Sequence, residues 1–398
     1  MTDSLRFELL VDHRQSPESS LIRRYLRGCG LELGAAEAER FQEYLGAASI
    51  EEGVRIVPLL VHRGVRVDVL DETSRMHTRT FKSLDGCVTA AHCMRNGYDR
   101  VVLESGGNAG TAIAAYCRKL GIETYCFVPE RNLPLLNSQV FSSATNHLIA
   151  VQEDGMVKAA SRRFAQKHGL PMVPSVEWRF EAGMLRGQFI LEQLLAGRRI
   201  DWLAQTISAA FGPIGIYRGL RRHGRGLPAM PRFLAVQQAT NCPMFEQWRR
   251  GLDVGGRGGR IDGQLLVSVM YDTAPQTHGT YPELADLVQD TRGSMTTVSR
   301  DELDSFLDRR FDDGTVIELL ARQDIRFGER SGEVSEKAGL LALAGLLKQI
   351  DCGDIAEGSV ALVSLTGGAA DNCGGVACGQ RITSIEQVDQ IPLTGMPC

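Results

Sequence analysis

Lysine is scarce in this sequence of 398 residues. Lysine and arginine together number 44, and six of these are lysine: Lys82, Lys119, Lys158, Lys167, Lys337 and Lys348. Arginine therefore provides most of the positive charge. A retained lysine is a candidate for chemistry that needs an amine, because arginine neither deprotonates nor forms a Schiff base. Five of the six lie on polar faces of predicted helices, whereas Lys82 follows a threonine-rich segment at residues 77–81.

Long apolar runs and an excess of charge of one sign are also missing. The longest apolar stretch, Ala338–Leu347, is too short to span a membrane. The chain starts MTDSLRFELLVDHR, without the basic start and apolar run of a secretory signal. A net charge of -4 offers no general attraction to nucleic acid or to an anionic membrane. We therefore expect a cytoplasmic protein that acts on a small molecule, with neither nucleic acid nor membrane as a partner.

Paired cysteines are missing as well. None of the ten cysteines forms a C-x-x-C motif, and most lie within apolar patterns, which is typical of reduced thiols that pack as small hydrophobic side chains. Cys373 and Cys378, the pair closest in sequence, lie in a glycine-rich stretch without a nearby histidine. We therefore expect no metal site. Arg250–Gly263 is rich in glycine and arginine but lacks aromatic residues that stack on bases, so we expect a surface loop there.

Short apolar strands alternate with helices over most of the chain. Strand Arg100–Leu103, helix Thr111–Leu120 and strand Thr124–Val128 begin a first alternating block. A long helix at Phe180–Leu195 ends this block, and a second block begins at Trp202. Such alternation predicts an α/β fold with two domains, each an open, twisted, mostly parallel sheet with helices on both faces.

The same pattern suggests where the domains divide. Residues 1–85 comprise N-terminal helices and part of the large domain. Residues 86–195 form a small α/β domain, and residues 196–398 form the rest of the large domain.

Lys82 lies at the predicted start of a helix, after Asp71 and Glu72 and the segment Thr78–Phe81. The positive end of the helix dipole disfavours an ammonium and favours a neutral amine, the form that a nucleophilic lysine needs. A solvated lysine at a helix start is the plainer interpretation of this segment taken alone.

Three further segments place glycines or hydroxyls where a strand ends. Glu104–Gly110 (ESGGNAG) and Ala210–Gly219 (AFGPIGIYRG) each connect a buried strand to a helix, and Ser364–Gly368 (SLTGG) closes a third strand. Glycines at such turns let backbone N–H groups approach a carboxylate or a phosphate. The dinucleotide motif G-x-G-x-x-G is not matched, which argues against NAD.

In their order and spacing, these four segments resemble the fold type II enzymes that depend on pyridoxal phosphate (PLP). This group includes cysteine synthase, threonine synthase, cysteate synthase, the serine and threonine dehydratases and the tryptophan synthase β subunit. The resemblance runs from about Val57 to Asn372 and is nearest to threonine synthase or cysteate synthase. It implies PLP in the cleft between the two domains, bound as a Schiff base to Lys82, an amino-acid substrate and a homodimer.

The resemblance also assigns roles to individual residues. Asn108 would contact the 3′-oxygen of PLP, and Thr366 its pyridine nitrogen. The remaining implied contacts are the substrate with Arg79, Thr80, Ser105, Gly106 and Gly107, and the PLP phosphate with Gly212, Pro213, Ile214, Gly215 and Ile216.

Two departures from the family pattern stand out. Pro213 donates no N–H, and Ile214 and Ile216 replace the usual glycine or threonine, so the phosphate loop is unusual. Arg79 replaces a small residue. It either faces outward or provides a cation for an anionic substrate.

The function that the resemblance implies is β-replacement on an O-activated, preferentially phosphorylated, amino acid through an aminoacrylate intermediate. Lys82 would act as general base. The alternatives are a β-elimination lyase of the dehydratase or ammonia-lyase type, or a catalytically silent PLP-binding relative.

Overall fold

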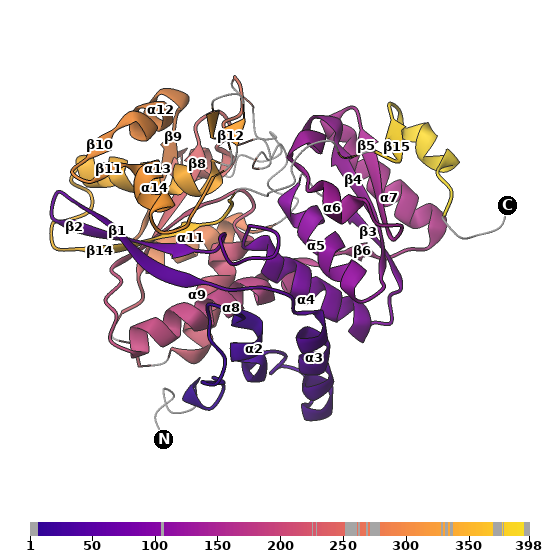
Figure 1. Cartoon of the computed structure of the whole chain (residues 1–398), viewed down its shortest axis with the longest axis horizontal. Coiled ribbons are helices and arrows are strands. Elements are labelled where there is room, and N and C mark those ends of the chain that lie inside the picture. Colours follow the sequence, from indigo (N-terminus) through magenta and orange to yellow (C-terminus); the bar gives the residue numbers. More distant parts are fainter. Residues whose placement is uncertain are drawn as a thin grey trace.

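The computed structural model describes residues 7–104, 107–224, 226–227, 229–250, 261, 263–267, 270, 279–327, 329–330, 333–334, 337–368, 376 and 378–393. Two sheets dominate these residues (Figure 1). The α/β class, the parallel pairing and the helices on both sheet faces are as the sequence predicts.

The larger sheet has six strands in the order β1-β2-β14-β7-β8-β9. Their bounds are β1 Arg55–His62, β2 Val65–Asp71, β14 Val360–Leu365, β7 Trp202–Thr206, β8 Arg232–Gln238 and β9 Ser294–Val298. β1 pairs antiparallel with β2, and every other pairing is parallel. β14 and β7 are buried along their whole length. This burial explains why β14 is almost continuously apolar and why β7 begins with three apolar residues.

The smaller sheet is entirely parallel and has the order β15-β5-β4-β3-β6. Its strands are β15 Gln380–Ile382, β5 Asn146–Val151, β4 Glu123–Pro129, β3 Arg100–Glu104 and β6 Met172–Val173. Two short antiparallel ribbons complete the described strands: β10 Arg310–Phe311 with β11 Gly314–Thr315, and β12 Glu329–Arg330 with β13 Glu333–Val334.

A layer of helices lies between the two sheets, and its apolar side chains form one continuous core with the inner faces of both. The helices of this layer are α4 Lys82–Arg95, α5 Asn108–Lys119, α6 Ser138–Phe141, α8 Val176–Leu195, α9 Phe211–His223 and α11 Tyr281–Asp290. Because α4 and α5 start at this shared core, the residues at their N-termini can meet in one site.

The outer faces of the sheets have separate cores. The outer face of the larger sheet is covered by α12 Arg300–Asp308, α13 Val316–Ala321 and α14 Ala338–Asp351. The outer face of the smaller sheet is covered by α7 Val157–His168 and η6 Ile385–Gln390. The remaining helical segments are α2 Leu21–Tyr25, η1 Leu26–Gly28, α3 Ala35–Ala48, η2 Glu130–Leu135, η3 Asp154–Met156 and α10 Pro243–Arg250.

The chain crosses between the sheets more often than the predicted domain division implies. We assigned residues 196–398 to the large domain, but β15 pairs with β5 of the smaller sheet. We assigned α8 to the small domain, but it packs along α9 at the larger sheet. A division by contiguous residue ranges therefore describes this fold only approximately.

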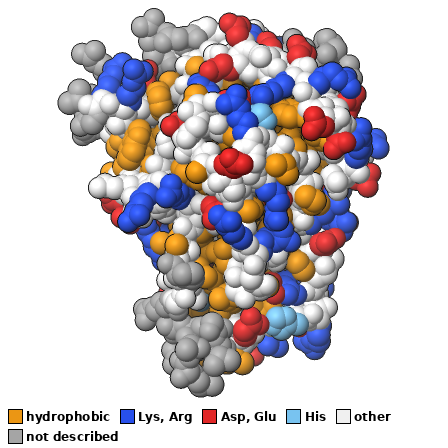
Figure 2. Space-filling view, turned by 90° about the vertical axis from the view of Figure 1, so that its left-hand side faces the viewer, with side chains coloured by type: hydrophobic (Ala, Val, Ile, Leu, Met, Phe, Trp, Pro, Cys, Tyr) orange, Lys and Arg blue, Asp and Glu red, His pale blue; other side chains and the backbone are white. Residues whose placement is uncertain are grey.

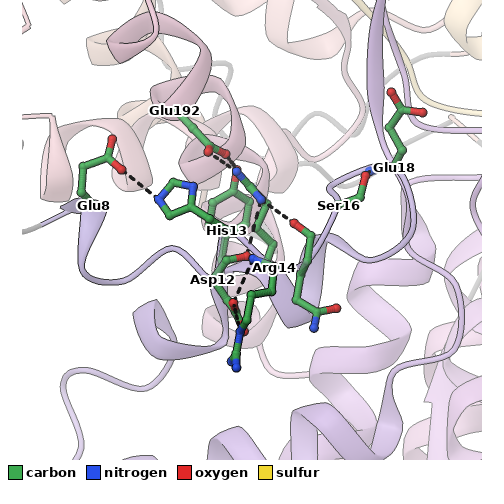
Figure 3. A network of polar contacts seen from close by, with 10 residues as sticks. Glu8, Asp12, His13, Arg14, Ser16, Glu18 and Glu192 are labelled. Carbon is green, nitrogen blue, oxygen red and sulfur yellow. Dashed lines mark hydrogen bonds and ion pairs between the residues drawn. The ribbon is translucent and has the colours of Figure 1, made fainter.

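The N-terminal segment is attached to α8 by a polar network (Figure 3). Arg24 and the hydroxyl of Tyr25 both donate to the carboxylate of Glu192, the latter over 2.5 Å. Arg24 also donates to the carbonyl of Gln15. These contacts hold residues before β1 against the inner helix layer.

The surface charge is mixed. Positive and negative side chains are interspersed over the face that Figure 2 shows, in keeping with a net charge of -4. Among the helices of the described residues, none is long and apolar enough to cross a bilayer.

Candidate active site

The candidate site lies where the central strands of the larger sheet end. Thr80 Oγ1 donates to the carbonyl of Thr366 over 2.7 Å, and the N–H of Phe81 donates to the same carbonyl over 3.2 Å. The N–H of Gly368 returns a bond to the carbonyl of Arg79 over 2.8 Å. The segment before Lys82 is therefore fixed against the end of β14, and two candidates far apart in sequence, Lys82 and Thr366, are brought together.

The turn between β2 and α4 is organised by Asp71. Its carboxylate accepts from the backbone and hydroxyl of Thr73 over 3.1 and 2.9 Å, from the N–H of Ser74 over 2.9 Å, and from Arg55 Nε over 3.0 Å. Although burial opposes the charged form, these bonds hold the pKa of Asp71 below its ordinary value. Asp71 thus shapes the approach to Lys82 rather than facing a substrate.

Lys82 is the first residue of α4, as the sequence predicts for a helix start. Its Nζ lies 2.6 Å from Asp85 Oδ2 and 4.2 Å from the centroid of the Phe81 ring, and its side chain is 18% exposed. Burial lowers the pKa of Lys82. The charge of Asp85 opposes this shift, and those of Arg179 and Arg186 add to it. A lysine with a lowered pKa has more of the neutral amine that acts as a nucleophile or a base.

Arg186 lies at the ends of the three central strands. On α8, it donates to both carboxylate oxygens of Glu72, just beyond β2. Its Nη2 also donates to Gln205 Oε1 of β7 over 2.8 Å and to Ser364 Oγ of β14 over 3.4 Å. Burial raises the pKa of Glu72, with Arg186 opposing the shift. Phe81 lies against Arg186 too, with Cζ 4.7 Å from the ring centroid.

The start of α5 provides the second side of the site. Gly107 precedes Asn108 and has φ 155°, a backbone conformation that favours glycine. At Gly86 of α4, a Cβ would lie 2.7 Å from the carbonyl oxygen of Ala112, so α4 and α5 are in close contact about one turn from each N-terminus. This contact brings the starts of both helices, and hence Lys82 and Asn108, to the same region.

The sequence prediction for the turn after β7 needs a correction. We expected a glycine turn at Gly212–Gly215, but the turn is Ile207–Ala210, and α9 begins at Phe211. Ala210 has φ 57° and takes the left-handed conformation for which the motif suggested glycine. The helix therefore begins earlier than the glycines indicate.

This shift changes what the predicted phosphate residues can offer. The N–H of Ile214 donates to the carbonyl of Ala210 over 3.2 Å, and the side chains of Ile214 and Ile216 are buried in the core. Pro213 lies in the first turn of α9, where an N–H would have no acceptor within the helix in any case. At the start of α9, backbone N–H groups such as those of Ala210 and Gly212 have no acceptor within the helix. These groups lie before most of the residues, Gly212–Ile216, that were predicted to bind the phosphate.

Arg79 and Thr80, the predicted substrate contacts on this segment, are differently placed. Arg79 has φ 56°, and its guanidinium donates to the carbonyl of Ser74 across the turn. Thr80 is buried, and its hydroxyl is occupied by the bond to Thr366. Ser105 and Gly106 lie outside the described residues, as does Cys373.

Sequence reasoning missed three residues near Lys82: Asp85, Arg179 and Arg186. Asp85 could have been noticed from its i,i+3 spacing to Lys82. Arg186 interrupts an apolar helix between Leu185 and Gly187, and a charged residue on a buried face signals a buried partner. Within the ranges that the structure describes, no three His, Cys, Asp or Glu side chains form a group that could hold a metal ion.

A half-buried lysine of lowered pKa thus lies at the carboxyl edge of an open α/β sheet, near the starts of α4 and α5. The model of the family "Pyridoxal-phosphate dependent enzyme" matches residues 54–367. The chain belongs to this family, and its cofactor is pyridoxal 5′-phosphate, which confirms the resemblance inferred from the sequence.

Curated relatives include two kinds of synthase. Cysteate synthase of Methanosarcina acetivorans is 26% identical over 309 residues, covering 73% of this chain and 68% of the relative. Threonine synthase of Halalkalibacterium halodurans is 24% identical over 297 residues, covering 73% of this chain and 74% of the relative.

Solved structures agree with the fold. Diaminopropionate ammonia lyase from Escherichia coli matches with a TM-score of 0.61 at 13% identity, covering 89% of this chain and 91% of that one. O-ureido-L-serine synthase matches with a TM-score of 0.53 at 15% identity, covering 84% of this chain and 96% of that one.

The residues present fit this cofactor. Lys82 would offer the amine for the carbonyl carbon of PLP, and the start of α9 would offer backbone N–H groups for its phosphate. Gly212 leaves room beside a buried guanidinium nitrogen, since a Cβ there would lie 2.8 Å from Arg186 Nη1.

Proposed function

We propose that the protein catalyses β-replacement on an O-activated amino acid, with a phosphorylated substrate preferred. Its relatives among the synthases support replacement. The preference for an anionic substrate is carried by the cations around Lys82. Arg179 Cζ lies 5.1 Å from the centroid of the Phe211 ring at the start of α9, and its charge lowers the pKa of Lys82. Arg79 precedes Lys82 on the adjoining turn.

In this proposal, each residue has a defined task. Bound PLP supplies an electron sink for the α-carbon of the substrate. Lys82 would hold PLP through its amine and would remove the α-proton of the substrate as general base. Phe81 and Asp85 restrict where its Nζ can lie. Gly107 and Asn108, at the start of α5, bind the substrate carboxylate and the 3′-oxygen of PLP, while Thr366 contacts the pyridine nitrogen.

The fixed positions of these groups orient the α-proton toward Lys82, and such orientation is a major part of rate enhancement. The cations, in turn, bind the leaving group of an anionic substrate. The β-substituent would leave with its bonding electrons, the incoming nucleophile would form the new bond to the same carbon, and Lys82 would return the proton to the α-carbon. The homodimer stays a prediction from the family resemblance.

A substrate panel tests this function. The holoenzyme is mixed with O-phosphoserine, O-acetylserine or serine, which all carry the leaving group on the β-carbon, each with and without sulfide or sulfite as nucleophile. We expect phosphate release from a phosphorylated donor and a new amino acid that forms only when the nucleophile is present.

The other outcomes separate the alternatives. Keto acid and ammonia formed at the same rate with or without nucleophile would identify an elimination lyase. A visible absorption band that no amino acid alters would identify a silent relative, and either result would contradict the proposal.

A further inference from the structure

Arg186 carries a buried N–H group that the protein leaves unsatisfied. The residue is 1% exposed, and its Nε and Nη2 are used by Glu72, Gln205 and Ser364. Across the part of the chain that the structure describes, Nη1 has no hydrogen-bond partner. A guanidinium N–H withdrawn from water without an acceptor is unfavourable, so this nitrogen is a candidate for a contact with a bound group.

Its position indicates which group. A Cβ at Gly212 would lie 2.8 Å from Arg186 Nη1, 3.1 Å from Gln205 Nε2 and 3.3 Å from Phe81 Cε2. Gly212 is the second residue of α9, so the free nitrogen lies against the first turn of this helix. The start of α9 is also where backbone N–H groups and the helix dipole favour an anion.

The same turn has lost one donor. Pro213, its third residue, has no N–H, whereas a typical helix start offers an amide there. The missing backbone N–H of Pro213 on α9 and the unused guanidinium N–H of Arg186 on α8 therefore lie next to each other. Gly183 of α8 is in close contact with Gly212 and Gly215, since its Cβ would lie 2.7 Å from the carbonyl oxygen of the first and 2.8 Å from Cα of the second.

We infer that Arg186 binds the phosphate of PLP through Nη1 and replaces the amide that Pro213 lacks. Glu72 accepts from Nε and Nη2 and thereby fixes the plane of the guanidinium, which leaves Nη1 for the phosphate. Arg186 is thus a cofactor-binding residue contributed by the long inner helix. This inference depends on the cofactor and not on the choice of substrate.

The test compares two ligands that differ only in the phosphate group. Apoprotein is titrated with PLP and with pyridoxal, and binding is followed by the visible absorption band.

Arg186→Lys keeps a positive charge for Glu72 but has a single nitrogen, which cannot serve both partners. The double variant Glu72→Gln/Arg186→Met removes the pair without leaving a buried charge unpaired. In each variant we expect the Kd for PLP to rise by about tenfold to a hundredfold. The Kd for pyridoxal should stay within about twofold, because it has no phosphate to lose the contact.

Controls separate this role from general damage to α8. Arg24→Lys alters another Arg–Glu pair, which joins α2 to Glu192 of α8, and should change neither Kd. Gly212→Ala leaves the Arg186–Glu72 pair in place but puts a methyl group against Nη1, and it should weaken PLP alone. Equal weakening of both ligands, or no change in either, would show that Arg186 is a structural residue and would overturn the inference. A failed substrate panel would leave this result unaffected.

Discussion

Lys82 concentrates the chemistry of this protein in one side chain. Its lowered pKa follows from burial, and its place at the start of α4 follows from the bonds that fix residues 79–81 to the end of β14. Borohydride reduction of the holoenzyme followed by peptide mapping should place the pyridoxyl group on Lys82. Lys82→Ala should lose turnover while still binding PLP weakly through the phosphate. A pyridoxyl group on any of the other five lysines would overturn the assignment.

Arg79 tests the choice of substrate. If its guanidinium reaches the substrate, the contact with a charged group is worth roughly 1.5–3 kcal/mol. Arg79→Gly should then lower kcat/KM for phosphorylated donors by about ten- to a hundredfold, with serine and O-acetylserine much less affected. The variant should fold, because φ at this position is 56°, where glycine is favoured over residues with a Cβ. Equal effects on both kinds of substrate would show that Arg79 has a structural role, such as its bond with the carbonyl of Ser74, and does not bind the substrate.

The contact between α8 and α9 decides where the start of α9 lies. A Cβ at Gly183 would lie 2.8 Å from Cα of Gly215, too close for the two backbones to keep their separation. Gly183→Ala should therefore destabilise the protein by about 1–3 kcal/mol and weaken PLP binding. Denaturant unfolding and a PLP titration measure the two effects. Gly155→Ala is the control, because nothing lies within 4 Å of its Cβ position. A Gly183→Ala variant as stable as the control would argue against the close approach.

The N-terminal segment depends on the Arg24–Glu192 pair (Figure 3). Both side chains are largely buried, at 11% and 13% exposure, so Arg24→Ala should cost about 1.5–3 kcal/mol at pH 7. Burial opposes the charge of Glu192, but the bond from Arg24 leaves its pKa below the ordinary value of 4.5. A lowered pKa gives stability that is present above pH 4.5 and is lost as the pH falls through the folded-state pKa.

Unfolding by urea at pH 7 and at steps down to pH 3 measures this linkage. The gap in unfolding free energy between wild type and Arg24→Ala should shrink as the pH falls. Arg14→Ala is the control, since Arg14 is 80% exposed and its ion pair with Asp12 should contribute little. A gap that stayed constant down to pH 3 would show that Arg24 acts through packing rather than through the charge of Glu192.

Local patterns predicted the elements well and their partners less well. The family resemblance assigned Lys82 and Thr366 to one site, and the bonds from Thr80 and Phe81 to the carbonyl of Thr366 place the start of α4 at the end of β14. The start of α9 was misplaced because Ala210 adopts the left-handed conformation expected of glycine. Arg186 was missed because its partners come from β2, β7 and β14, and helix periodicity does not say which strands a side chain meets. β15 was missed for the same reason, since its pairing with β5 spans most of the chain.

At the scale of the whole molecule, the candidate site joins both sheets. Lys82, Thr366 and the start of α9 come after β2, β14 and β7 of the larger sheet, while Gly107 and Asn108 follow β3 of the smaller one. A ligand that binds the folded state stabilises it by RT ln(1 + [L]/Kd), about 2.7 kcal/mol at a hundredfold excess over Kd. If Asn108 contacts PLP, the cofactor should slow amide hydrogen exchange at the start of α5 as well as at the starts of α4 and α9. Exchange measured with and without PLP, and with Asn108→Ala, tests this expectation. Protection confined to α4 and α9 in the wild type would show that PLP is held by the larger sheet alone and would remove the proposed role of Asn108.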